Sequence, residues 1–486
     1  MTKAASERKP RIPLGANYWK LWSSSVVSNL GDGVAQIAYP WLASAVTRSP
    51  VLIALIAVVQ RLPWLLFSLP AGVITDRVDR RKLMLSMNVF RTAITTVVAL
   101  VVYGQSSKLP SPDEIAGGID LPTNWIIYVT LVIAAMLFGM AEVLYDNAAQ
   151  TILPGVVEPE ALERANGNLW GAEMVMNSFI GPPLGSVLIG VAFALPFFFD
   201  AGTFAVSAAL LLLVAGTFTV DRSEEQLAAK VDWWGEIKEG VKWLWRHPLL
   251  RPMAIILGCL NALGSLVFAT LVLFAQEVLG VTAFVFAILG AAGAIGGVLG
   301  SVLSPRISKL LGSGTSLYTT FIAAFVTSVI IGLTSNWIVV FVSFGVFSFT
   351  AVLWNVITVS LRQTIIPDHL LGRVNSVYRF FAWGMMPIGL AAGGLIVAGV
   401  EGVGGSRELA LRMPWFVAAA AYVVLFIYAA PRLTTAKIEA ARAEGIAKKR
   451  PIGDVADGAD STGIGREAIA ESGLPVAIPP ELDDDP

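Results

Sequence analysis

The sequence predicts an all-α membrane protein with twelve transmembrane helices in two pseudo-symmetric six-helix bundles. Three observations lead to this fold class. The chain is 55% hydrophobic and 14% charged, with a mean hydropathy of +0.70, which is far from a soluble globular average. Long apolar stretches recur along the whole length, and two distant segments nearly repeat one another. A soluble core of this size needs more polar cover, so we expect the chain to lie in lipid.

Each apolar stretch is long enough to cross about 30 Å of hydrocarbon. Backbone groups in lipid must bond internally, and stretches of this length without period-two alternation favour helices over a barrel. The spans are expected at residues 20–47, 51–75, 83–104, 124–152, 167–190, 194–219, 250–278, 282–304, 314–334, 337–362, 374–399 and 411–430. Six spans belong to each half.

An internal repeat relates the two halves. The segment Gln150–Pro154 reads Gln-Thr-Ile-Leu-Pro and recurs as Gln363–Pro367, and an Arg-x-Asn follows each copy at Arg164 and Arg373. Duplication of a hydrophobic bundle is how many carriers build two halves around a central site. The repeat therefore predicts a duplicated membrane unit.

Basic residues predict the orientation of the spans. Of the 34 Lys and Arg residues, the loops on one side carry only Arg48, Lys108, Arg407 and Arg412, and Arg61, Arg91 and Arg379 fall within spans. The remaining basic residues lie on the side of both termini. We therefore expect both termini in the cytoplasm, and no cleavable signal peptide at the start.

Composition divides the chain into five parts. We expect residues 1–16 as a cytoplasmic segment, 17–220 as the N-terminal bundle and 250–430 as the C-terminal bundle. Residues 221–249 carry mixed charge and four Trp residues, which is typical of an amphipathic helix at the cytoplasmic interface. Residues 431–486 are expected as a cytoplasmic and largely disordered tail, with an Ala-, Lys-, Arg- and Glu-rich helix up to about Lys449.

Several functional classes are not favoured. Cys259 is the single cysteine, and only His247 and His369 offer imidazoles, so neither a disulfide nor a metal site is predicted. The formal charge of −1 gives no reason to expect nucleic acid. No nucleotide-binding loop and no nucleophile–base pair are present, so no cofactor and no enzymatic activity are expected.

A short polar turn follows the second span, with the pattern Gly72-x-x-x-Asp76-Arg77-x-Asp79-Arg80-Arg81. Glycine permits close helix approach, and carboxylate and guanidinium groups lock helices together. The pattern resembles the helix 2–3 signature of the major facilitator superfamily. The form with Asp79 is similar to the drug-exporter branch that includes macrolide-efflux and enterobactin-export proteins.

The resemblance implies roles for this turn. Asp76 is expected to cap a helix of the opposite half, and Arg80 to pair with an acid on helix 4, where Asp146 fits. The implied cytoplasmic gate consists of Gly72, Asp76, Arg77, Arg80, Arg81 and Asp146. A basic turn that merely obeys the positive-inside rule is the alternative.

Helix 5 contains Gly181-Pro182-Pro183-Leu184-Gly185, which is similar to one end of the antiporter signature of exporters in this superfamily. Proline removes a helical hydrogen bond, and the flanking glycines admit a neighbouring backbone. We expect a bend, or close packing on the other half, at Gly181, Pro182 and Gly185.

Acidic residues inside spans cost roughly 2.5–3.5 kcal/mol each at the bilayer centre, so each requires a cavity, a partner or a proton. Asp32, Glu142 and Glu173 are the candidates for proton coupling, with permanent ion pairs as the alternative. Arg379 is a possible partner of Glu173. Asp200 and Glu277 fall near external helix ends, where we expect them to be solvated or capping.

Arginines within the spans need partners of their own. Arg61 is expected to receive an anionic group or to neutralise Asp32, with a purely structural bridge as the alternative, whereas Arg91 is placed to extend toward the cytoplasmic leaflet. If the superfamily arrangement holds, helices 1, 4, 7 and 10 line the cavity. The expected lining is Tyr39, Trp41, Arg61, Tyr145, Asn261, Phe268, Trp354, Asn355 and Arg379.

The sequence therefore predicts a secondary transporter of the bacterial cytoplasmic membrane. It is expected to work as a monomer and to export amphipathic, drug-like molecules by proton antiport and alternating access. A siderophore or lipid exporter, or a uniporter of the same fold, is the first alternative. A membrane sensor or scaffold that does not transport is the second.

Overall fold

The computed structural model describes residues 12–111, 114–115, 121–219 and 233–449, and these residues form helices and short connections without a β-strand. The N-terminal half contains α1 (Gly15–Val46), α2 (Pro50–Arg77), α3 (Arg80–Gly104), α5 (Trp125–Ile152), α6 (Leu162–Val175), the π-helical turn η4 (Met176–Ile180), α7 (Gly181–Val191) and α8 (Leu195–Leu212). Short 3₁₀ turns lie at Ser106–Lys108, Leu153–Gly155 and Pro159–Ala161.

The C-terminal half begins with α10 (Trp233–Arg246) and continues with α11 (Leu250–Phe268), α12 (Leu271–Glu277), α13 (Ala283–Leu311), α14 (Ser313–Leu333), α15 (Trp337–Ile365), α16 (Asp368–Gly402), α17 (Arg407–Ala429) and α18 (Thr435–Lys449). The helix bounds follow the expected spans closely. The clearest differences are α8, which ends at Leu212 rather than near residue 219, and α13, which runs to Leu311 rather than to residue 304.

Eleven helical segments among the described residues are long and apolar enough to cross a membrane. The remaining helix, α1, is 32 residues long and spans about 48 Å at 1.5 Å per residue. Its hydropathy is low because it carries polar residues such as Ser24, Ser28 and Asp32, two of which are buried within the bundle. With α1 counted, the expected twelve-helix layout in two bundles is confirmed.

The two halves repeat one packing pattern. In the N-terminal half, α2 packs on α5, and α3 packs on both α5 and α8. In the C-terminal half, α13 packs on α15, and α14 packs on both α15 and α17. Because these helices stand at equivalent places in the two halves, the duplicated sequence has produced duplicated packing.

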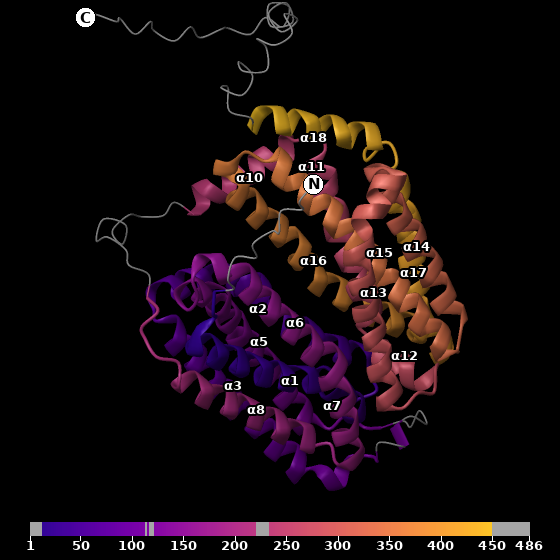
Figure 1. The fold of residues 1–486 in the computed structure, drawn as a ribbon. Helices are drawn as coiled ribbons and strands as arrows, with labels where there is room; N and C mark the ends of the chain where they lie inside the picture. The colour runs from indigo at the N-terminus through magenta and orange to yellow at the C-terminus, as the bar shows by residue number, and fades with distance from the viewer. Residues whose placement is uncertain (1–11, 112–113, 116–120, 220–232, 450–486) are drawn as a thin grey trace, which may run out of the picture.

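We call the end of the bundle that holds the start of α1 and the end of α17 the basic end. The opposite end, with residues 46–50, 277–283 and 402–407, is the far end. The two halves approach one another near α7 and α12 and diverge toward α10 (Figure 1). Contacts of α2 with α16 and of α7 with α13 join the halves.

The hydrogen bonds that join described residues of the two halves lie at the far end. Arg48, between α1 and α2, donates to Gln276 Oε1 and to Glu277 Oε1, both at 2.7 Å. Gln276 donates in turn to Ser44 Oγ at 2.8 Å. Arg407, at the start of α17, donates to the Arg48 carbonyl of the other half at 2.9 Å and to Glu277 Oε2 of its own half at 2.8 Å. This cluster fastens the halves at the far end.

Two further helices cover the basic end of the C-terminal half (Figure 1). The linker helix α10 packs on α16 and buries Leu244 completely. The tail helix α18 packs on α14 and α15, buries Ile438, and accepts a hydrogen bond from Ser313 Oγ at Glu439 Oε1, at 2.6 Å. The tail is therefore ordered and docked up to Lys449, and the expectation of disorder beyond it lies outside the described residues.

Candidate functional site: the cavity between the halves

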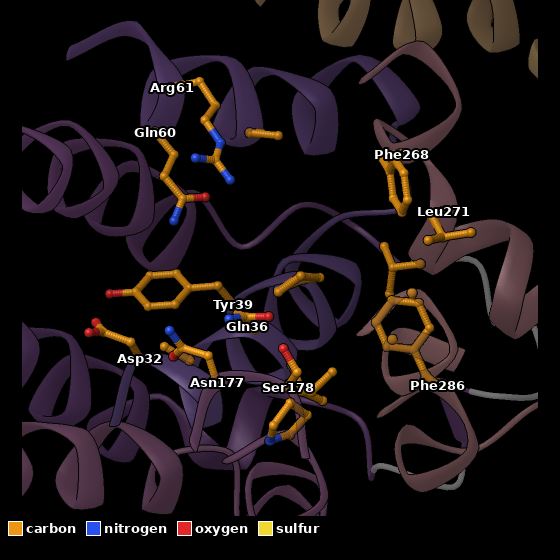
Figure 2. Close-up of a pocket in the computed structure, with 18 of the residues that line it drawn as sticks. Asp32, Gln36, Tyr39, Gln60, Arg61, Asn177, Ser178, Phe268, Leu271 and Phe286 are labelled. Atoms are coloured by element: carbon orange, nitrogen blue, oxygen red, sulfur yellow. The ribbon is translucent and has the colours of Figure 1, made fainter. Parts of the chain in front are cut away.

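A cavity of about 750 Å³ lies between the two halves. Most of its walls come from α1, α2, α5 and η4 on one side and from α11, α12, α13 and α15 on the other, with single residues from α3, α6 and α7. Figure 2 shows Asp32 and Tyr39 of α1 opposite Gln60 and Arg61 of α2, with Phe268, Leu271 and Phe286 closing the side toward the C-terminal half. One side of the cavity is thus polar and the other is apolar.

Four carboxylates line this cavity: Asp32 on α1, Glu142 and Asp146 on α5, and Glu173 on α6. Glu142 and Asp146 are four residues apart, so one face of α5 presents both. None of the four forms an ion pair with a described residue. The predicted pair Glu173–Arg379 is therefore absent. The three residues predicted for proton coupling are indeed brought together around one space.

Two arginines border the same cavity without holding these acids. Arg61 is exposed and faces the cavity, and it forms no ion pair with a described residue. Arg91 is only 1% exposed, and its guanidinium lies over the rings of Phe138, Tyr145 and Phe204 at 5.1, 4.7 and 5.3 Å. The expectation that Arg91 extends toward the membrane surface is therefore wrong, because three aromatic faces hold the cation inside the bundle.

The structure corrects part of the predicted lining. Trp41 is 1% exposed and packs on Phe286 at 5.8 Å, so it belongs to the core beside the cavity. Tyr145 contacts Arg91 and does not reach the cavity, and Arg379 lies outside it. The sequence shows how deep in the membrane a residue lies along its helix. Whether its side chain faces the cavity depends on how the neighbouring helices pack.

The other predicted lining residues border two spaces. Asn261, Trp354 and Asn355 line a second, mostly apolar cavity of about 200 Å³ within the C-terminal half. Phe268 lies between the two cavities and lines both. The Asn261 amide donates to the Ala382 carbonyl at 2.9 Å, so this amide serves partly to connect α11 to α16.

The turn between α2 and α3 is organised differently from the predicted gate. Arg80 donates to the Thr151 carbonyl at 2.7 Å, and the predicted bond from Arg80 to Asp146 is absent. Arg80 starts α3 at the basic end, where the last carbonyls of α5 are unpaired. Asp146 lies five residues earlier along α5, about 7.5 Å farther from that end, and it lines the cavity instead.

The other residues of this turn connect helices of the same half. Arg81 donates to the carbonyls of Leu211, Leu212 and Gly216 at the end of α8. Arg77 is exposed and forms no hydrogen bond with a described residue. Gly72 and Asp76 lie in α2, but the surroundings of their side chains fall outside the described part of the chain.

The sequence pattern predicted no role for Asp79 beyond the similarity to the drug-exporter branch. In the structure, Asp79 Oδ1 accepts from the Lys82 amide at 2.9 Å and caps the start of α3. Its Oδ2 accepts from the Phe218 amide at 2.7 Å. Asp is a preferred N-cap residue, and the helix start at Arg80 was the signal that could have revealed this role.

The fifth span changes from an α-helix to a π-helical turn just before the proline motif. The π-helical turn η4 ends at Ile180, directly before Gly181. A Cβ atom on Gly181 would lie 2.6 Å from Gly33 Cα, and one on Gly185 would lie 2.7 Å from the Val34 carbonyl oxygen. These glycines therefore pack on α1 of their own half rather than on the other half. Pro182 lines the cavity.

Two acids predicted as solvated or capping are enclosed. The Glu277 side chain is 12% exposed and contacts both Arg48 and Arg407. Asp200, on α8, is 1% exposed. The prediction that both acids are solvated or capping is wrong. Glu277 is covered where the two halves meet at the far end, and Asp200 is covered where α8 packs against α1.

Twelve membrane-spanning helices among the described residues, in two equivalent bundles around an acidic cavity, are the layout of a multi-pass membrane transporter. The sequence profile of the Major Facilitator Superfamily matches residues 21–390. The chain belongs to this superfamily, as its helix 2–3 turn indicated.

Among characterised proteins, this chain is similar in sequence to efflux pumps. The chain is 25% identical over 394 residues to the multidrug efflux pump Tap of Mycolicibacterium fortuitum, covering 76% of this chain and 87% of that protein. It is 23% identical over 180 residues to macrolide efflux protein A of Streptococcus pyogenes, covering 36% of this chain and 40% of that protein.

Solved structures share the fold. A bacterial homologue of the iron transporter ferroportin in its inward-facing state superposes with a TM-score of 0.63 at 16% identity, covering 85% of this chain and 98% of that one. A bacterial homologue of the human lysosomal transporter Spinster superposes with a TM-score of 0.63 at 13% identity, covering 90% and 98%. At this level of identity the likeness concerns the fold alone.

Proposed function

We propose that the protein exports amphipathic, drug-like molecules across the bacterial cytoplasmic membrane in exchange for protons. The observation that carries the proposal is the set of four carboxylates in one cavity, none of them held in an ion pair by a described residue. A carboxyl that no cation holds ionised can take up and release a proton. The similarity to multidrug and macrolide efflux proteins supports the direction and class of cargo.

The cavity suits a molecule with one apolar and one polar side. Phe268, Leu271 and Phe286 offer apolar surface, and the smaller cavity beyond Phe268 extends it, whereas α1 and α5 offer carboxylates. Pockets of several hundred cubic ångströms with few polar groups bind drug-sized ligands. Cargo enters from the basic end, which we propose to be cytoplasmic with both termini, because the far end is fastened by Arg48, Glu277 and Arg407.

Alternating access supplies the coupling. Substrate and protons compete for the carboxylates, and the halves rock so that the far end opens when the basic end closes. Each proton that re-enters down 100 mV releases roughly 2.3 kcal/mol. At about 1.4 kcal/mol per factor of ten, one proton supports about a fifty-fold gradient of a neutral substrate. We propose the monomer as the working unit.

Transport in proteoliposomes with an imposed pH gradient tests this function. The purified protein is offered fluorescent cationic dyes, macrolides and siderophores, and uptake is compared with that of Asp32→Asn and Glu142→Gln. Gradient-driven uptake should fall at least tenfold in both variants. The matched control is Glu408→Gln, because Glu408 is exposed at the far end and pairs only with Arg412 among the described residues. Gradient-driven flux that survives loss of both cavity acids would refute the assignment of proton coupling to Asp32 and Glu142.

A further inference from the structure

A buried acid that does not line the cavity packs against α1. Asp200 of α8 is 1% exposed, and neither of its carboxylate oxygens has a hydrogen-bond partner among the described residues. The neighbouring Thr203 hydroxyl donates to the Asp200 backbone carbonyl at 2.7 Å, so it does not satisfy the carboxylate. An ionised carboxylate without a hydrogen-bond partner is costly in such surroundings, which favours the protonated form.

The backbone of α1 is shaped around this acid. A methyl group at Gly31 would overlap both Asp200 Oδ1 and the Thr203 hydroxyl. The carboxyl group therefore lies directly against α1, one residue before Asp32, which lines the cavity. Two acids thus lie beside the same turn of α1, one facing the cavity and one enclosed behind it.

The charged and titratable groups near Asp200 are few. From α1 come Asp32 and Tyr39, from α3 comes Arg91, and α7, which also packs on α8, has no titratable residue. Arg91 is itself buried and forms no ion pair with a described residue. It can balance a charge on either Asp32 or Asp200 without holding one of them permanently.

Tyr39 offers a connection between the two acids. Its ring packs edge-on against Phe197 of α8 at 5.1 Å, and it lines the cavity beside Asp32. Its hydroxyl is buried and has no hydrogen-bond partner among the described residues. A hydroxyl both donates and accepts, and because this one bonds to neither carboxyl group in the structure, it passes a proton between them after a movement of the side chain.

We propose that Asp200 is a second proton-binding site, which exchanges its proton with Asp32 during the transport cycle. One proton moves from the Asp200 carboxyl to the Asp32 carboxylate, so that one acid becomes charged as the other becomes neutral, and the positive charge of Arg91 remains between them. This rests on the proposed proton antiport. It adds a storage site that the substrate does not reach, because Asp200 does not line the cavity.

The Asp200→Asn variant keeps the shape of the side chain and removes the titrating group. Without a pH gradient, we expect its rate of substrate exchange to stay within twofold of the native rate. With a pH gradient, we expect its rate of uptake to fall at least tenfold. Infrared difference spectra between acid and alkaline pH should lose one protonated-carboxyl band. The control is again Glu408→Gln, which should keep both exchange and the band.

Other outcomes overturn the proposal. Native gradient-driven uptake in Asp200→Asn, or an unchanged carboxyl spectrum, would show that Asp200 never exchanges its proton. If Asp200→Asn does not fold, Asp200→Glu keeps the acid and should transport with a shifted pH midpoint, and an unshifted midpoint would count against it. If the native protein itself shows no gradient-driven flux, the proposed function fails, whereas the infrared titration still reports on Asp200.

Discussion

The Arg48 guanidinium of the N-terminal half and the Glu277 carboxylate of the C-terminal half lie 2.7 Å apart at the far end. Their side chains are 10% and 12% exposed, so solvent screens the pair only in part. Arg407 shares the same carboxylate, and Gln276 extends the cluster to Ser44. Opening of the far end requires the bonds of Arg48 and Ser44 to the C-terminal half to break, whereas the bond between Arg407 and Glu277 lies within that half.

Replacement of Arg48 by Gln should shift the protein toward a state that is open at the far end. A charged hydrogen bond contributes about 1.5–3 kcal/mol, which corresponds to about a 10–150-fold change in the ratio of the two states. In a Cys259→Ser background, a cysteine introduced at Ala57 of the cavity wall should react faster with an impermeant maleimide added at the far side.

Arg412→Gln is the matched control for this experiment. Arg412 also lies at the far end, but it bonds to Gly332, Thr334, Ser335 and Glu408 of its own half. Labelling that rises equally in both variants would show a general loosening of the far end. Labelling that rises in neither would mean that the pair with Glu277 does not restrain opening.

Arg80 and Asp146 should contribute independently. Arg80 bonds to the Thr151 carbonyl, whereas Asp146 lines the cavity. In a double-mutant cycle with Arg80→Gln and Asp146→Asn, thermal unfolding should give a coupling energy within about 0.5 kcal/mol of zero. A coupling energy of 1 kcal/mol or more would contradict this prediction and support the Arg80–Asp146 ion pair that the superfamily resemblance implied.

Asp79→Ala should destabilise the basic end of the N-terminal half. The substitution removes the N-cap of α3 and leaves the Phe218 amide without its acceptor, which together cost about 1–3 kcal/mol. The unfolding temperature in detergent should fall. Arg77→Ala, at an exposed position two residues away, should leave it unchanged, and an equal drop in both variants would contradict the capping role.

Gly389→Ala should destabilise the packing of α16 on α11. A Cβ atom at Gly389 would lie 2.9 Å from Ala262 Cα, and a backbone cannot move aside as a side chain does. We expect a loss of about 1–3 kcal/mol in the free energy of unfolding. Gly399→Ala in the same helix meets no atom within 4 Å, so it should be neutral or stabilising by up to about 1 kcal/mol. Similar losses at both positions would contradict the packing role of Gly389, because helix propensity favours Ala over Gly.

Much of the site could be predicted from residue type and helical spacing. Glu142 and Asp146 share a face because they are four residues apart, and the cost of acids in lipid predicted a cavity beside them and Asp32. The structure brings these residues together. It does not bring Trp41, Tyr145 or Arg379 into the lining, because two residues at the same depth can face opposite sides of a helix.

Partners across the bundle were harder to predict. The resemblance paired Arg80 with Asp146, but the nearer acceptor at the end of α5 is a backbone carbonyl, and a motif does not reveal unpaired carbonyls. Arg91 was expected to extend outward because charge alone was considered, whereas three aromatic rings from two other helices surround it.

The sequence by itself determined the membrane class, the twelve spans, the twofold design and the acids within the first half, because hydropathy and spacing are properties of each segment alone. Only the tertiary structure decided which charges are paired and which are enclosed. Asp200 illustrates the reason: its burial depends on the contact of α8 with α1, and on a glycine far away in the chain that leaves room for a carboxyl group.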